Sequence, residues 1–302
     1  MAANGTVLLA GADTRHGRAY ALAFFAGGYR VRAFVPEAPA GHPDQSASAA
    51  RAAAALGAEP VTAEPGDGRA IRRLVKGAGA VIIALDGRDA EGRTAEEQTT
   101  RALVEAAAAE RVAIVYSSLL HAERQTGVAA LDLKGRLELV ARRSGAPVTI
   151  VRPGLLMDVF DDADLRERAT RDGVLASGIA VDTPVSYLAA DDLGLLAVLA
   201  LEIFGPVGAT LDLGGPQAVT FRELIPHLWR MTGHSVTYEQ ASLLEVRARS
   251  DEDGARLVAH INGAGYAVDM NTLLAHVPAR LTTLTDYLAA RGWATQAGRV
   301  AA

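Results

Sequence analysis

The chain has 302 residues, half of them hydrophobic and only 5% aromatic, and its formal net charge is −5. It has no cysteine, which excludes disulfides, thiolate metal sites and a cysteine nucleophile. No basic stripe and no apolar run of bilayer length is present, so we expect no direct nucleic-acid partner and no membrane span. The first residues lack the basic region of a signal peptide, and we expect a cytoplasmic monomer or homodimer.

The first half of the sequence alternates strand-like and helix-like segments. Short apolar runs predict strands at 6–10, 30–35, 60–63, 80–85, 113–116 and 148–151. The segments between them predict helices at 17–27, 47–56, 70–76, 94–109 and 131–144, with a loop over 36–46. This alternation is typical of an α/β fold, here a Rossmann-type doubly wound parallel sheet.

The alternation stops after residue 153. Strand-like segments become isolated, at 185–188, 210–213 and 235–238, and the helices between them have clear caps, among them a Thr220–Glu223 capping box. We therefore expect a dinucleotide-binding Rossmann domain over 1–153. A smaller C-terminal α+β cap lobe is expected over 154–302, from which some segments can return to the main sheet.

A glycine turn joins the first strand to the first helix, where dinucleotide folds bind the pyrophosphate at the helix N-terminus. The segment GADTRHG, residues 11–17, has glycine at both ends but Thr14 where the middle glycine usually stands. The threonine side chain takes space where the backbone approaches the pyrophosphate, and its hydroxyl can partly compensate by donating a hydrogen bond to a phosphate oxygen. The sequence of this turn therefore predicts either weak nucleotide binding or a turn that preserves the fold but no longer binds a nucleotide.

The end of the second strand usually selects between the two nicotinamide cofactors, because a carboxylate there holds the ribose of NAD and an arginine holds the 2′-phosphate of NADP. Glu37 lies about 20 residues past Gly17, a suitable spacing for a ribose contact, or else it is a solvated loop acid. Pro36 offers neither a charge nor a backbone N–H. Arg15 and Arg32 are the cations that could reach a 2′-phosphate. The sequence thus predicts no clear advantage of NADPH over NADH.

A series of segments resembles the NmrA-like branch of the short-chain dehydrogenase/reductase superfamily. In order they are VLLAGADTRHGR, YRVRAFV, GAEPVTAEPGD, GAGAVIIAL, VAIVYSSLL, KGRLELVARRSGAPVTIVRPGLLMD, VSYLAADDLG, LDLGGPQAVTFRELIPHLWRMTGHSVTYEQ and ARLTTLTDYLAARGW. The resemblance implies a nucleotide along the carboxyl ends of the strands and a small-molecule substrate beneath the cap. It leaves the chemistry open, because the family includes NAD(P)H quinone oxidoreductases and redox-sensing regulators.

The expected cofactor contacts combine the glycine turn, the second strand and the positions that the resemblance implies. The resemblance itself contributes Asp67, Leu85, Asp86 and the region after Tyr116. The full set is Gly11, Asp13, Thr14, Arg15, His16, Gly17, Arg32, Glu37, Asp67, Leu85, Asp86, Ser117, Lys134 and Pro153.

Reduction of a carbonyl needs a proton donor near the developing oxyanion. Lys134 is the first candidate, since isoflavone-reductase-like relatives use a lysine in the helix after the fifth strand, although Ala130 replaces the tyrosine of the ordinary Tyr-x-x-x-Lys pair. Lys134 could instead hold the nicotinamide ribose, or be a surface lysine paired with Glu138 at i,i+4.

Further candidates for catalysis follow the fifth strand or lie in the cap. Ser118 and His121 come directly after that strand, at the expected catalytic edge. Tyr187 lies on a strand-like segment of the cap, where it faces the pocket or is packed. The histidines show no metal-ligand spacing, so we expect no metal.

Two classes of function follow from these observations. The first is an NAD(P)-dependent oxidoreductase acting on a small apolar carbonyl or quinone-like compound, such as one of secondary metabolism. The second is a redox-silent protein with a degenerate cofactor site, either a nucleotide-sensing regulator or a cyclase, dehydratase or isomerase. Thr14 and Pro36 favour the second class, whereas Lys134 and the family pattern favour the first.

Overall fold

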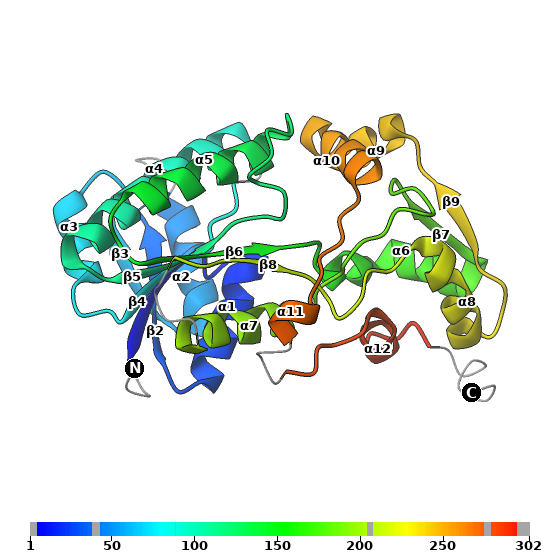
Figure 1. Ribbon diagram of the computed structural model, residues 1–302, viewed down its shortest axis with the longest axis horizontal. Helices are drawn as coiled ribbons and strands as arrows, with labels where there is room; N and C mark the ends of the chain where they lie inside the picture. Colours follow the sequence, from blue (N-terminus) through cyan, green and yellow to red (C-terminus); the bar gives the residue numbers. More distant parts are fainter. Residues whose placement is uncertain (1–4, 38–42, 88, 204–207, 275–278, 295–302) are drawn as a thin grey trace. The chain divides into compact units, whose positions relative to one another are not determined.

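The computed structural model describes residues 5–37, 43–87, 89–203, 208–274 and 279–294, without the side chains of 43–45, 203 and 272. The chain forms two compact units (Figure 1). The first comprises 1–125, 130–152 and 190–211, and the second comprises 126–129, 153–189 and 212–302. Segment 190–211, which the sequence assigns to the cap lobe, thus belongs to the first unit.

The main sheet has the strand order β3-β2-β1-β4-β5-β6-β8, with buried apolar strands at its centre and more exposed strands, β3 and β8, at its edges. Its strands are β1 (Thr6–Ala10), β2 (Arg30–Pro36), β3 (Glu59–Ala63), β4 (Ala80–Ile83), β5 (Ala113–Ser117), β6 (Val148–Pro153) and β8 (Thr210–Leu213). The pairs from β3 through to β6 are all parallel. Every residue of β4 and β5 is buried, as continuous apolar runs in a parallel sheet predict. The expected Rossmann-type α/β fold is confirmed.

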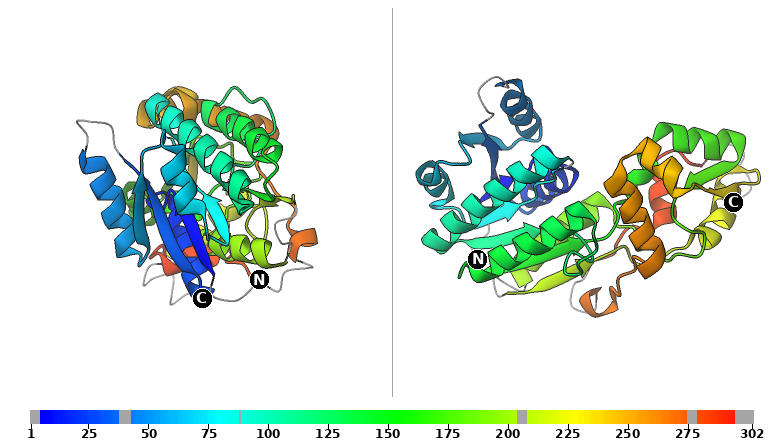
Figure 2. Two further views of the ribbon diagram at one scale, coloured as in Figure 1. Left: turned by 90° about the vertical axis from the view of Figure 1, so that its left-hand side faces the viewer. Right: turned by 90° about the horizontal axis from the view of Figure 1, so that it is seen from above.

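The helices of the first unit are α1 (Arg15–Ala26), α2 (Pro43–Ala55), α3 (Gly68–Val75), α4 (Ala90–Glu110), α5 (Ala129–Arg143) and α7 (Ala190–Ile203). Helices α3, α4 and α5 cover one face of the sheet, and the view from above in Figure 2 shows α4 and α5 side by side over the strands. Helices α1 and α7 pack together on the opposite face (Figure 1). They approach so closely that a Cβ at Gly194 would lie 2.4 Å from the carbonyl oxygen of Ala19.

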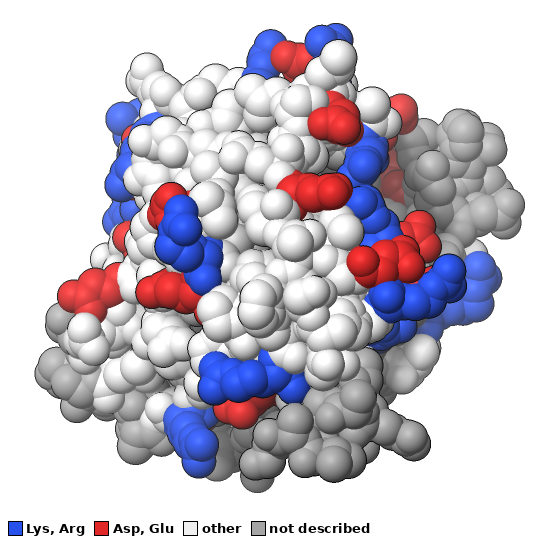
Figure 3. Space-filling view, turned by 90° about the vertical axis from the view of Figure 1, so that its right-hand side faces the viewer, with Lys and Arg blue, Asp and Glu red and all other residues white. Residues whose placement is uncertain are grey.

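The second unit contains short helices and one small sheet in which β7 pairs in parallel with β9. Its elements are η1 (Met157–Asp161), α6 (Ala163–Glu167), η2 (Arg168–Asp172), β7 (Val174–Ser177), α8 (Phe221–Thr232), β9 (Thr237–Gln240), α9 (Leu243–Arg249), α10 (Glu252–Ala264), α11 (Asn271–Leu274) and α12 (Leu284–Ala290). The predicted capping box of Thr220 and Glu223 is confirmed at the start of α8. On the face that Figure 3 draws, acidic and basic side chains are interspersed.

The prediction of a strand at 185–188 is wrong. These residues make only isolated bridges, in which Val185 pairs with Val219 and Tyr266, and Leu188 pairs with Leu156. A strand needs several consecutive residues paired with the same neighbouring segment. Here the four residues 185–188 pair with three different segments, so no continuous ladder forms. The apolar pattern identified buried backbone but could not identify its partners.

Candidate cofactor site

The turn after β1 is built on two glycines that leave no room for a side chain. Gly11 has φ +88°, and a Cβ there would lie 2.4 Å from the carbonyl oxygen of Ala84. A Cβ at Gly17 would lie 1.9 Å from the carbonyl oxygen of Gly11. The two glycines therefore let α1 start directly against the ends of β1 and β4, so that the N-terminus of α1 opens on the carboxyl edge of the sheet.

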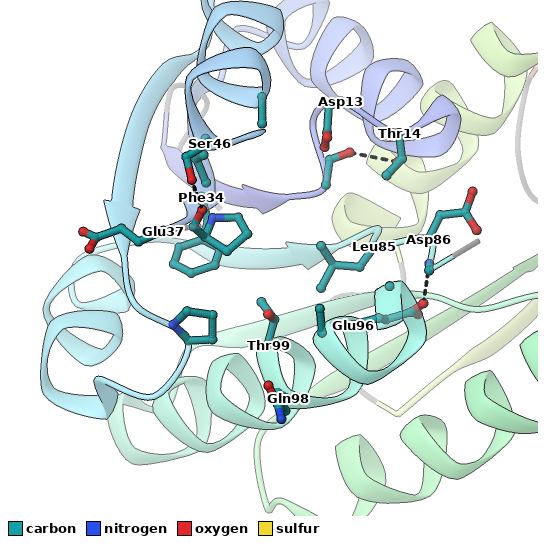
Figure 4. A pocket seen from close by; sticks show the side chains of 18 of the residues that line it. Asp13, Thr14, Phe34, Glu37, Ser46, Leu85, Asp86, Glu96, Gln98 and Thr99 are labelled. Atoms are coloured by element: carbon teal, nitrogen blue, oxygen red, sulfur yellow. Dashed lines mark hydrogen bonds between the residues drawn. The ribbon is translucent and has the colours of Figure 1, made fainter. Parts of the chain in front are cut away.

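Thr14 is the N-cap of α1, and its hydroxyl points into the turn (Figure 4). The Oγ1 atom accepts a hydrogen bond from the Gly17 amide at 3.0 Å and lies 2.8 Å from the carbonyl oxygens of both Gly11 and Ala84, which share its proton. The sequence suggests that this hydroxyl can donate to a phosphate oxygen. In the structure its proton is shared between the two carbonyl oxygens, so the hydroxyl joins the start of α1 to the end of β4.

A cavity of about 600 Å³ opens beside this turn (Figure 4). Its volume falls within the roughly 300–1,000 Å³ of small-molecule and cofactor sites. The walls come from the turn after β1, the end of β2, the first half of α2, the loop after β3, the loop after β4 and the first half of α4. Of the expected cofactor residues, the cavity brings together Gly11, Asp13, Thr14, Glu37, Leu85 and Asp86.

The charged side chains that line the cavity are carboxylates. They are Asp13, Glu37, Glu64, Asp86 and Glu96, and no lysine or arginine lines it within the described parts of the chain. Glu37 stands at the exposed end of β2, and in Figure 4 its side chain extends away from Leu85 and Thr99. An additional phosphate on a bound nucleotide would therefore meet negative potential.

Two expected cofactor residues contact helix α3 instead of the cavity. Arg32 donates a hydrogen bond to the carbonyl oxygen of Leu74 at 3.2 Å, near the C-terminal end of α3. Asp67 is the N-cap of the same helix, and its side chain accepts hydrogen bonds from two backbone amides of the first turn. Both side chains thus have local structural partners, and neither lines the cavity.

Two other expected residues, Pro153 and Tyr187, belong to the second unit. The ring of Tyr187 is buried and packs edge-on against Phe160, with 5.1 Å between the ring centroids. Burial raises the pKa of the Tyr187 hydroxyl above its usual range. The tyrosine is therefore a packed core residue of its own unit.

Lys134 is buried between the ends of β4 and β5, with 7% of its side chain exposed. Its ammonium donates to the carbonyl oxygens of Leu85, at 2.6 Å, and of Ser117, at 3.3 Å. It also forms an ion pair with Oε1 of Glu96 at 2.6 Å. The interpretation of Lys134 as a surface lysine paired with Glu138 is thus wrong.

Sequence reasoning missed Glu96, which lies on α4 and lines the cavity. Its second oxygen, Oε2, accepts a hydrogen bond from the Gly87 amide at 2.8 Å (Figure 4). Glu96, Thr99, Thr100 and Leu103 are all buried and recur at the i, i+3, i+4 and i+7 positions of one helix face. A carboxylate in such a stripe is the sequence signal that could have identified it.

His16, Ser117 and Tyr20 form a hydrogen-bonded chain. The Tyr20 hydroxyl donates to Ser117 Oγ at 2.9 Å, and Ser117 Oγ lies 3.2 Å from His16 Nδ1. Because Ser117 accepts from Tyr20, we assign its own proton to the bond with Nδ1, which leaves the imidazole proton on Nε2. Burial, followed by the charge of Lys134, lowers the pKa of His16 to about 4, so the ring is neutral near pH 7.

Ser118, which follows β5, belongs to a separate buried network. Ser118 donates to Oε1 of Glu138 at 2.6 Å, and the Glu138 carboxylate forms a two-point pair with Arg152 at 2.8 and 2.6 Å. His121 is buried and has a left-handed φ of +68°. Neither Ser118 nor His121 lines the cavity.

The chain belongs to the NmrA-like family, whose model matches residues 3–287. This family binds NAD(P), and the structural neighbours include complexes with NADPH and NADP(H). The resemblance that the sequence segments indicated is therefore confirmed.

Two solved structures illustrate the shared fold. The NADPH-dependent quinone oxidoreductase from Escherichia coli, complexed with NADPH, has a TM-score of 0.76 and 22% identity, covering 94% of this chain and 99% of that one. The triphenylmethane reductase from Citrobacter sp., complexed with NADP(H), has a TM-score of 0.74 and 20% identity, covering 95% and 99%. At these identities the likeness establishes the fold.

A curated relative carries a defined activity. The (4-alkanoyl-5-oxo-2,5-dihydrofuran-3-yl)methyl phosphate reductase from Streptomyces griseus is 28% identical over 189 residues. The match covers 61% of this chain and 62% of that protein, which is less than two thirds of its length.

The described residues place limits on other kinds of site. No helix among them has both the length and the apolar character needed to cross a membrane. They also contain no group of three or more histidine or acidic side chains arranged to hold a metal ion.

Proposed function

We propose that the protein is an NAD(P)H-dependent reductase of a small apolar carbonyl or quinone-like compound. The observation that carries this proposal is the cavity beside the N-terminus of α1, in a chain whose family binds NAD(P). The residues present fit such a cofactor. Gly11 and Gly17 bring α1 to the strand ends. The hydroxyl of Thr14 is directed to the carbonyl oxygen of Ala84, so it does not project into the cavity.

Each part of the cavity has a role in this proposal. Backbone amides at the start of α1 would hold the pyrophosphate, and Glu37 or Asp13 would accept hydrogen bonds from ribose hydroxyls. A bound nicotinamide supplies a hydride. His16, neutral and protonated on Nε2, offers a hydrogen-bond donor next to the strand ends without bringing a positive charge.

The lining charges bear on the choice of cofactor. Carboxylates line the cavity, and Arg32, one of the two arginines that could reach a 2′-phosphate, is bonded to Leu74, while Arg15 is not among the lining residues. A 2′-phosphate beside carboxylates is disfavoured by like-charge repulsion. We therefore propose that NADPH has no advantage over NADH in this protein, even though the two structural neighbours were solved with the phosphorylated cofactor.

The relatives suggest the electronic character of the substrate. Their names specify a quinone, a triphenylmethane compound and an alkanoyl dihydrofuranone, all of which are conjugated electron acceptors. A hydride donor reduces such compounds readily because the added electron pair is delocalised. We propose the same chemical class, a conjugated and largely apolar acceptor, for this protein.

Calorimetric titration of NADH and NADPH into the purified protein tests the proposal. We expect one or both to bind, and we expect oxidation of the bound nucleotide in the presence of a naphthoquinone or an unsaturated lactone. Ala95→Trp fills the cavity and should abolish binding, whereas Ala109→Trp, also exposed on α4 but outside the cavity, should not. A wild type that binds neither nucleotide would favour the redox-silent alternative.

A further inference from the structure

The ammonium of Lys134 makes two hydrogen bonds and one ion pair. The hydrogen-bond acceptors are the carbonyl oxygens of Leu85 and Ser117, at 2.6 and 3.3 Å. Oε1 of Glu96 lies 2.6 Å from the ammonium as its ion-pair partner, without accepting a hydrogen bond. With its side chain 7% exposed, Lys134 is almost closed off from solvent, and these contacts are with the protein itself.

The position of Lys134 relative to the cavity is also informative. Leu85 and Glu96 line the cavity, whereas Lys134 does not. The ammonium therefore lies behind the wall that its two partners form. A proton donor must reach the reacting atoms, whereas Lys134 does not line this cavity.

The segment held by these contacts is the loop that follows β4, residues 84–87. Thr14 binds the carbonyl oxygen of Ala84, Lys134 binds that of Leu85, and Glu96 accepts from the amide of Gly87. Most of this loop lines the cavity. Three side chains from the turn after β1, from α5 and from α4 thus fix one short stretch of the cavity wall.

We propose that the Glu96–Lys134 ion pair positions the cofactor-binding loop 84–87, and that Lys134 does not deliver a proton to the substrate. The proposal rests on the proposed reductase function. The side chains of Lys134 and Glu96 are 7% and 4% exposed, and removal of either one would leave a buried charge unpaired. Lys134 is therefore a positioning residue, and Glu96 is its partner.

Selective labelling of lysine tests the burial of the ammonium directly. The sequence contains two lysines, Lys134 and the exposed Lys76. Reductive methylation of the folded protein, followed by peptide mass spectrometry, should modify Lys76 and leave Lys134 protected until the protein is denatured. Equal modification of the two lysines in the folded state would overturn the proposal.

Variants test the positioning role. Lys134→Met and Glu96→Gln each leave one buried charge unpaired, so both should be less stable, and the double variant should recover the fold. We expect the double variant to bind NADH at least about tenfold more weakly, because small misplacements of binding groups have large effects. Amides 84–87 should also exchange hydrogen faster. Lys76→Met, at an exposed residue, and Glu97→Gln, at a half-buried residue of α4 that pairs with Arg101, are the matched controls.

The kinetic readout separates positioning from proton transfer. If Lys134 is a positioning residue, the double variant at saturating NADH keeps the wild-type dependence of kcat on pH. If Lys134 were a proton donor, the double variant would keep its NADH affinity, lose about 10²- to 10⁴-fold in kcat and lose one limb of the dependence of kcat on pH. That result would overturn the proposal. A double variant with wild-type NADH affinity and hydrogen exchange would overturn it equally. If the wild type itself does not use NADH, the proposed function fails, while labelling and exchange still decide whether the pair holds the loop.

Discussion

The hydroxyl oxygen of Thr14 lies 2.8 Å from the carbonyl oxygen of Ala84, so the turn after β1 is bonded to the end of a neighbouring strand. At the position where a glycine usually admits the nucleotide, this chain has a helix cap that also joins α1 to β4. The threonine is therefore part of the structure of the turn, and its effect on stability can be separated from its effect on binding.

Thr14→Val keeps the shape of the side chain and removes the hydroxyl. We expect it to lower the free energy of unfolding by about 1–2 kcal/mol, because α1 loses its cap and the Gly11 and Ala84 carbonyls lose their donor. Thr14→Ser, which retains the hydroxyl, should stay within about 0.5 kcal/mol of the wild type. Chemical denaturation measures both. Equal stability of the two variants would show that the hydroxyl bonds contribute little.

Thr14→Gly separates the two roles of the residue. The sequence predicts that this variant binds nicotinamide nucleotide more tightly, because the side chain beside the pyrophosphate is removed. The structure adds that it should also be less stable, since the bond to Ala84 is lost. Calorimetry on the folded protein, together with thermal unfolding, measures both effects. Unchanged affinity would mean that Thr14 does not obstruct the nucleotide.

The partly buried histidine of the turn, His16, gives the protein a pH-dependent stability. Burial lowers the pKa of His16 from its ordinary 6.5 to about 4 in the folded state. Between these values the unfolded chain binds more protons, so this contribution to stability is full above about pH 6.5 and is lost as the pH falls toward 4. His16→Gln should reduce the loss of unfolding free energy between pH 7 and 4 by on the order of 3 kcal/mol.

His234 provides a control of opposite sign. Hydrogen bonds to the carbonyl oxygens of Thr170 and Ser235 raise the pKa of this exposed histidine. Its contribution is therefore present at low pH and lost as the pH rises through the folded pKa. His234→Gln should leave the acid-side slope assigned to His16 in place. If the slopes of His16→Gln and the wild type are the same, His16 is not the group responsible.

The strands of the main sheet could be predicted because each is marked by a short apolar run in its own segment of the sequence. The apolar runs that form β1, β4 and β5 are buried on both faces, and their boundaries fall within two residues of those predicted. Helix α2 starts at Pro43, inside the predicted loop, because the missing N–H of proline is harmless in the first turn of a helix and its fixed φ suits that position.

The partners of the site residues could not be predicted in the same way. Glu138 lies one helical turn from Lys134 and was the partner that spacing offered, but it binds Arg152. The partner of Lys134 is Glu96, on another helix and 38 positions away in the chain, which only the arrangement of α4 and α5 over the sheet brings close. Local spacing contains no information on such a contact.

Ser118, a candidate for catalysis in the sequence, should prove to be structural. Its hydroxyl donates to the buried carboxylate of Glu138, so Ser118→Ala should lower the free energy of unfolding by about 1–3 kcal/mol. The cofactor affinity should not change, since Ser118 does not line the cavity. Denaturation and nucleotide titration of the variant measure the two quantities. A stable variant with impaired turnover would return Ser118 to the catalytic candidates.

The carboxylates around the cavity should determine cofactor choice. We expect the wild type to bind NADPH no more tightly than NADH, and Glu37→Arg or Glu64→Arg to shift the ratio of the two dissociation constants toward NADPH by about tenfold. The shift should shrink at high salt, because these positions are near solvent.

Glu59→Arg is the matched control, since it makes the same change of charge on the exposed first residue of β3 and lies outside the cavity. Calorimetric titrations of both reduced cofactors into all four proteins, at low and at high salt, give the ratios. Glu59→Arg changes the net charge by the same amount but places no charge in the cavity. It should therefore leave the ratio of the two dissociation constants close to that of the wild type. A wild type that already prefers NADPH, or an equal shift in Glu59→Arg, would show that the carboxylates of the cavity do not select the cofactor.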